Sequence, residues 1–139
     1  MPRRKSFGID IAEDSVAYSR RKNRCAIVSG RCFVEQGSAD ALPFEATMFD
    51  VVTAYETVYF WPDLPRAFAE VARVLKPGGT FTFSYGLKTD AAMRYWEEQV
   101  KAMHLLPTEE ITVLLTTAGF INIQTATKGA ASINFRAVR

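Results

Sequence analysis

Short apolar runs alternate with amphipathic segments along this chain of 139 residues, and the alternation predicts the order of its elements. Runs rich in β-branched and aromatic residues are typical of strands, whereas apolar residues spaced three and four apart are typical of helices. The last apolar strand before the middle of the chain, FDVVTAY, carries apolar residues on both faces, which indicates burial on both sides. The segments that we expect to form strands are 6–11, 31–37, 49–55 and 80–86.

Helical signals fill the segments between these strands. Residues 12–24 place acids first and bases last, as the helix dipole favours. Asp63 can cap a further helix, which the sequence KPGG at 76–79 is expected to end. The apolar stripe of that helix consists of Phe68, Val71, Ala72 and Leu75. Two later stripes consist of Met93, Trp96, Val100 and Met103, and of Ile111, Leu114, Leu115 and Ala118.

The C-terminal segment alternates apolar and polar residues in two runs, 120–127 and 130–138, around Lys128 and Gly129. That pattern predicts an antiparallel hairpin. Strands that alternate with helices favour a parallel sheet covered by helices. The expected fold is therefore α/β: a mostly parallel sheet with helices on both faces and a C-terminal antiparallel hairpin.

The composition, 48% hydrophobic and 23% charged, is typical of a soluble globular protein, and the length suits a single domain over 1–139. A net charge of +2 is too small to indicate binding to nucleic acid or to an anionic membrane. No apolar run reaches the ~18 residues of a membrane-spanning helix, and no signal peptide is recognisable, so we expect a cytoplasmic protein. The spacing of Cys25 and Cys32 fits no metal or redox motif, which predicts free thiols and no metal site.

Candidate binding residues follow the predicted strands, because ligands of parallel sheets collect at the carboxyl ends of the strands. Asp10 ends the first strand, where its carboxylate can accept hydrogen bonds from the hydroxyls of a ribose or can cap the following helix. Gly37, Ser38 and Ala39 follow the second strand, where small residues either let backbone amides approach a flat ring or form an ordinary turn. These residues by themselves leave both alternatives open.

The third strand leads into TAYETVYFWPD, residues 53–63, which gathers aromatic side chains beside one carboxylate. Tyr55, Tyr59 and Trp61 near Glu56 would suit a pocket for a small or cationic group. The alternative is that the aromatic rings cover the end of the sheet.

Four stretches together carry a family resemblance: GIDIAEDSVAYSR, QGSADALPF, FDVVTAYETVYFWPD and AEVARVLKPGGTF. In order and spacing they closely resemble the class I S-adenosylmethionine-dependent methyltransferases, in the branch that acts mostly on small molecules. The likeness runs from Phe7 to the C-terminal hairpin. It implies a Rossmann-like sheet, S-adenosyl-L-methionine as the cofactor and methyl transfer to a small-molecule acceptor. A nicotinamide-dependent oxidoreductase would share the acid after its second strand, but LPF, FD and LKPGG in this order argue against it.

The resemblance also implies roles for the residues near the first two strands. Asp10 matches the acid that holds the ribose hydroxyls, and Ile11 matches the apolar residue beneath the adenine. Ser38 and Ala39 match the pair at the adenine edge. Many relatives have an aspartate in place of Ser38, so adenine recognition here would depend on the backbone amide of Ala39.

Further roles implied by the resemblance fall after the third strand. Ala54 and Tyr55 match the residues beside the methionine part of the cofactor. Glu56 and Tyr59 would then face the acceptor, with Glu56 as the candidate general base or as the group that attracts a cationic acceptor. Methyl transfer is an in-line displacement from an activated sulfonium, so alignment of the reactants is the main catalytic requirement.

One departure from the family concerns the N-terminus, where only MPRRKS precedes FGIDI. The first strand of the family and its glycine-rich loop should stand there, so we expect an N-terminally truncated domain. The missing strand normally lies between 6–11 and 49–55, and without it both would expose unpaired backbone edges. A homodimer or partner chain could complete the sheet, the two strands could pair directly, or the sequence could be a fragment. The alternative function is a non-catalytic methyltransferase-like remnant or subunit that serves as an interaction or dimerisation module.

Overall fold

The computed structural model describes residues 4–87, 89–129 and 131–139. The chain divides into two compact units with the boundary between Pro43 and Phe44. The expectation of a single domain over 1–139 stays a prediction.

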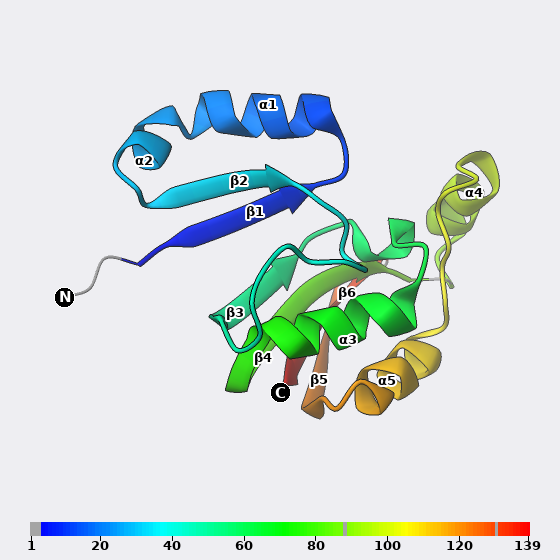
Figure 1. Ribbon diagram of the computed structural model, residues 1–139. Helices are drawn as coiled ribbons and strands as arrows, with labels where there is room; N and C mark the ends of the chain where they lie inside the picture. Colours follow the sequence, from blue (N-terminus) through cyan, green and yellow to red (C-terminus); the bar gives the residue numbers. More distant parts are fainter. Residues whose placement is uncertain (1–3, 88, 130) are drawn as a thin grey trace. The chain divides into compact units, whose positions relative to one another are not determined.

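The first unit is built around a parallel pair of strands, β1 (Ser6–Asp10) and β2 (Cys32–Gln36). A parallel pair needs a crossover connection, which α1 (Glu13–Lys22) and α2 (Arg24–Val28) provide. Helix α1 runs along the pair (Figure 1) and contacts both strands. The predicted helix over 12–24 is thus confirmed for most of its length, and a second short helix follows it.

The second unit contains a mixed sheet with the strand order β3-β4-β6-β5. Strand β3 (Phe49–Ala54) is parallel to β4 (Leu75–Gly86), and β6 (Ser132–Val138) is antiparallel to both β4 and β5 (Ile121–Lys128). The predicted C-terminal hairpin is confirmed, although Ala130 at its turn lies outside the described residues. Parallel pairs joined through helices and finished by an antiparallel hairpin confirm the α/β fold class.

Helices α3 (Leu64–Val74) and α5 (Thr108–Thr117) pack side by side against this sheet (Figure 1). The short 3-10 helix η1 (Val58–Phe60) leads into α3, whose N-cap Asp63 accepts a hydrogen bond from the amide of Arg66 at 3.0 Å, as predicted. Helix α4 (Ala91–Gln99) follows β4.

The core between these helices and the sheet is rich in phenylalanine. The rings of Phe81 and Phe83 on β4 are fully buried and lie 4.7 Å apart. Phe83 also stacks on Phe135 of β6 at 4.8 Å, and Phe68 of α3 packs against both β4 rings. Since burying one such ring stabilises a fold by about 1.5–3 kcal/mol, this cluster fixes the position of α3 on the sheet.

Several details differ from the sequence prediction. Helix α3 ends at Val74, and Leu75 is extended and pairs with Phe49 at the start of β4, so Leu75 is buried as a strand residue. Helix α4 ends at Gln99, and Met103 is buried in the loop beyond it rather than on a helical stripe. Val51 is 59% exposed because β3 is an edge strand of its sheet, so burial on both faces is wrong for this residue. Trp96 in α4 is 54% exposed.

Candidate functional site

Asp10 lies at the carboxyl end of β1, beside the carboxyl end of β2, as the sequence predicted. The amide of Gly37 donates to the carbonyl oxygen of Asp10 at 3.0 Å, which joins the two strand ends. The Oδ1 atom of Asp10 accepts a hydrogen bond from the amide of Ala12 at 2.8 Å, where Ala12 is the N-cap of α1. Among the described residues Oδ2 has no protein partner. The carboxylate therefore holds the turn into α1 and keeps one oxygen available to a ligand.

Ile11 presents an apolar side chain next to this carboxylate. It is 71% exposed, and its carbonyl oxygen accepts a hydrogen bond from Nε2 of Gln36 at 3.0 Å. The backbone of Ile11 is thus fixed while the side chain faces solvent. An exposed apolar group beside an exposed carboxylate can contact the face of a ring and a polar sugar at the same time.

Ser38 and Ala39 lie in a tight turn after β2. The amide of Ala41 donates to the carbonyl oxygen of Ser38 at 3.2 Å, which closes the turn around Ala39. The hydroxyl of Ser38 donates to the carboxylate of Asp40, a residue that the sequence analysis did not single out. Asp40 therefore places a carboxylate beside Ser38, and its separation of only two residues from Ser38 was the signal that could have identified it.

At the end of β3 in the second unit the backbone takes an uncommon conformation. Ala54 is buried, Tyr55 is 65% exposed, and Glu56 has a φ of +51°, in the left-handed region that favours glycine. For a residue other than glycine this conformation costs on the order of 1–2 kcal/mol. The amide of Glu56 donates to Oγ of Ser84 on β4 at 2.8 Å, and this bond to a buried hydroxyl holds the strained residue in place. Strained residues held this way are typical of functional sites.

The structure brings Glu56 and Tyr59 into direct contact. The hydroxyl of Tyr59 donates to Oε2 of Glu56 at 2.8 Å, and the ring of Tyr59 is 7% exposed within η1. Burial first, and then the hydrogen bond and negative charge of Glu56, raise the pKa of Tyr59 well above the ordinary tyrosine value. The phenol is therefore a permanent donor at neutral pH, which orients the Glu56 carboxylate. Ser84, which completes this cluster, carried no sequence signal.

Trp61 takes the alternative role. The Trp61 ring stacks parallel to Phe81 with centroids 6.5 Å apart, and its edge approaches Phe68 at 6.4 Å. Trp61 thus covers the phenylalanine core at this end of the sheet.

In the part of the chain that the structure describes, no group of three or more His, Cys, Asp or Glu side chains could hold a metal ion. Cys25 and Cys32 are free thiols. None of the described helices has the length and apolar composition needed to cross a membrane.

Comparison with known proteins gives one family. Residues 2–83 match the family described as a methyltransferase domain. The chain is 31% identical over 102 residues to the sterol 4-C-methyltransferase strm-1 of Caenorhabditis elegans, covering 73% of this chain and 30% of that protein. It is 38% identical over 94 residues to the fatty-acid O-methyltransferase of Mycolicibacterium smegmatis, covering 65% of this chain and 31% of that protein. The matches therefore span about a third of the length of these curated relatives.

Solved structures agree in fold. A SAM-dependent methyltransferase from Thermotoga maritima has a TM-score of 0.71 at 22% identity, with coverage of 99% of this chain and 83% of that chain. One from Aquifex aeolicus has a TM-score of 0.77 at 17% identity, with coverage of 96% and 68%. At these identities the likeness establishes the fold alone.

Proposed function

Because this chain belongs to the class I S-adenosylmethionine-dependent methyltransferases, we propose that it functions in methyl transfer from S-adenosyl-L-methionine to a small, largely apolar acceptor. The observation that carries the proposal is the exposed carboxylate of Asp10 at the carboxyl end of a parallel strand pair. One of its oxygens stabilises the chain turn, and the other is oriented by that same turn with no protein partner among the described residues. This arrangement fits a ligand with adjacent hydroxyls, as a ribose has.

In the first unit we assign the adenosine part of the cofactor to five residues. Asp10 accepts hydrogen bonds from the ribose hydroxyls, and the exposed side chain of Ile11 covers one face of the adenine. The amide of Ala39 and the turn that begins at Ser38 meet the adenine edge. The carboxylate of Asp40, held by the Ser38 hydroxyl, adds negative charge where the adenine amino group would donate.

In the second unit we assign the methionine part and the acceptor to residues after β3. Ala54 and Tyr55 lie beside the methionine part, and Glu56 faces the acceptor. The cofactor supplies an activated methyl group, so the protein mainly has to align the acceptor with it. Glu56 accepts a proton where the acceptor must lose one, or attracts a cationic acceptor. Tyr59 is a positioning residue, because its protonated hydroxyl holds the Glu56 carboxylate.

The apolar character of the acceptor is supported by the relatives. Two of the relatives matched by this chain are named for a sterol and for a fatty acid. Both compounds are mostly hydrocarbon. We therefore assign an acceptor of this class to the chain.

Isothermal titration calorimetry with S-adenosylhomocysteine, the demethylated product, tests the proposal directly. We expect saturable heat with a dissociation constant on the order of micromolar, which corresponds to roughly 8 kcal/mol of binding free energy. An absence of heat at millimolar ligand, with a folded protein by circular dichroism, would refute cofactor binding by this chain.

A second function is favoured by the strand edges. In the described residues β1 pairs only with β2, and β3 pairs only with β4, so each has one backbone edge without a strand partner in its own sheet. Such edges are templates for strand addition. We propose that a homodimer or a partner chain adds a strand there. Light scattering across protein concentrations tests this, and a strictly monomeric chain that binds S-adenosylhomocysteine would exclude the homodimer.

A further inference from the structure

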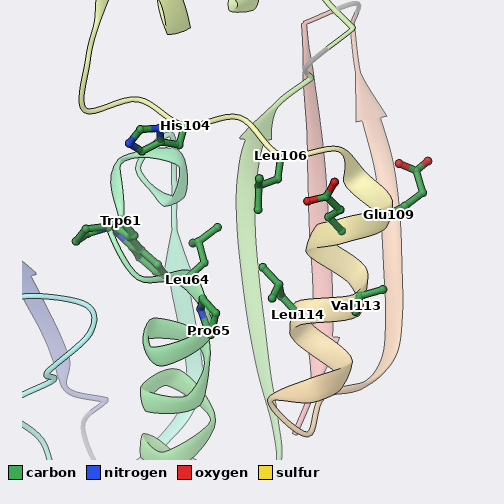
Figure 2. A pocket seen from close by; sticks show the side chains of 10 residues that line it. Trp61, Leu64, Pro65, His104, Leu106, Glu109, Val113 and Leu114 are labelled. Atoms are coloured by element: carbon green, nitrogen blue, oxygen red, sulfur yellow. The ribbon is translucent and has the colours of Figure 1, made fainter.

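An apolar pocket of about 590 Å³ lies in the second unit, between the N-terminal end of α3 and helix α5 (Figure 2). Figure 2 shows Trp61, Leu64 and Pro65 on one side, Val113 and Leu114 of α5 on the other, and Leu106 at the end from which α5 begins. The volume is within the range of sites that bind small organic molecules. The pocket is separate from the hydrogen-bonded pair of Glu56 and Tyr59, neither of which lines it.

Buried contacts fix the walls of this pocket. The Trp61 ring is held by its stacking on Phe81, with an interplanar angle of 8°. The amide of Leu106 donates to the hydroxyl of the fully buried Tyr85 at 2.9 Å, and the amide of His104 donates to the carbonyl oxygen of Tyr59 at 2.7 Å. Since the walls are attached to the core, the pocket exists before any ligand binds, and binding costs little reorganisation.

The charge around the pocket has one sign. Glu109 and Glu110, in the first turn of α5, belong to the lining, and no lysine or arginine does. Among the described residues neither carboxylate takes part in an ion pair. Acids at this place suit the helix dipole, which is sufficient to explain their presence. For a ligand in the pocket, these two carboxylates nevertheless create a negative potential beside an apolar surface, and no lysine or arginine in the lining neutralises it.

We propose that this pocket binds an apolar ligand that carries a positive charge at one end, of the chemical class of an alkylamine. The hydrocarbon part contacts Trp61, Leu106 and Leu114, and its transfer from water supplies most of the affinity. The ammonium group lies near Glu109 and Glu110, whereas a carboxylate in the same place would be repelled. The proposal is independent of methyl transfer, because it requires only the second unit.

The two tryptophans of the chain make the pocket measurable. Trp96 is in α4 and does not line the pocket, so Trp96→Phe leaves Trp61 as the sole tryptophan reporter. In this background octylamine, 1-octanol and octanoate are titrated at neutral pH, each below its aggregation limit. We expect a saturable change of Trp61 emission, with octylamine bound most tightly and octanoate least. Equal affinity for octylamine and octanoate, or octanol binding as tightly as octylamine, would overturn the assignment of a cationic ligand.

Two variants separate the apolar and the charged contributions. The double change Glu109→Gln and Glu110→Gln is at exposed positions and should weaken octylamine binding roughly fivefold while octanol binding stays unchanged. Leu114→Phe places a larger ring in the pocket and should weaken the response to all three compounds. Ile121→Phe, an exposed position outside the pocket, is the matched control and should bind like the Trp96→Phe parent. Unchanged octylamine affinity in the double glutamine variant contradicts the charge assignment. A response to none of the compounds in the parent overturns the small-ligand site and leaves the surface to a protein partner.

Discussion

Asp10→Asn is the most informative perturbation of the proposed cofactor site, because it separates two roles of one side chain. Asparagine keeps the shape and one carbonyl oxygen, which can still accept the hydrogen bond from the amide of Ala12. It replaces the second oxygen, which has no protein partner in the described structure, with an amino group that cannot accept. The turn into α1 should therefore persist while ribose binding is lost.

The magnitude follows from the number of hydrogen bonds affected. Hydrogen bonds to a charged group contribute about 1.5–3 kcal/mol each, and losing one raises the dissociation constant roughly 10-fold to 150-fold. Calorimetry with S-adenosylhomocysteine measures this change. Asp14→Asn is the matched control, because it removes the same charge from an exposed position in the first turn of α1, and it should bind like the wild type.

Thermal unfolding distinguishes the two roles. Asp10→Ala removes the bond to Ala12 as well and should lower the free energy of unfolding by about 1 kcal/mol, whereas Asp10→Asn should leave it nearly unchanged. If Asp10→Asn binds the ligand within a factor of two of the wild type, or if Asp14→Asn loses as much affinity, the ribose assignment is wrong and Asp10 is only a structural cap.

Three further predictions concern the second unit. Ser84→Ala removes the acceptor for the strained amide of Glu56 and should lower the free energy of unfolding by about 1–2 kcal/mol in urea titrations, and an unchanged free energy would show that this bond does not hold the turn. The raised pKa of Tyr59 means that the unfolded state loses this phenol proton first, so the contribution of Tyr59 to stability should be constant below about pH 10 and fall above it. Tyr59→Phe should lessen the fall of stability above about pH 10, and an equally steep fall in the variant would refute the reasoning. Phe83→Ala leaves a cavity between Phe81 and Phe135 and should cost about 3–5 kcal/mol, and a loss below 1 kcal/mol would show that the ring cluster is not the core.

The sequence by itself determined the order of helices and strands, because each helix or strand depends mainly on residues that are close to one another in the chain. Asp63 caps α3 through a bond to Arg66, three residues away, and the two apolar runs around Gly129 pair with each other as a hairpin. The same local logic placed Asp10 at a strand end, and the family likeness then supplied its expected role. These are the parts of the site that could be predicted, and the roles of Asp10, Ile11, Ser38, Ala39, Ala54 and Tyr55 stay predictions.

Only the tertiary structure decided the features that join distant residues. The hydrogen bond that holds Glu56 in its strained conformation comes from Ser84, 28 positions away. The pocket is lined by residues from the start of α3 and from α5, which are far apart in the sequence. Leu75 and Met103 fit helical stripes by spacing, yet a strand pair and a loop bury them instead. The spacing of apolar residues predicts which face of a helix or strand is buried. It does not predict where the element ends or which distant residue contacts it. Those outcomes depend on packing and on long-range hydrogen bonds, which form only when the whole unit folds.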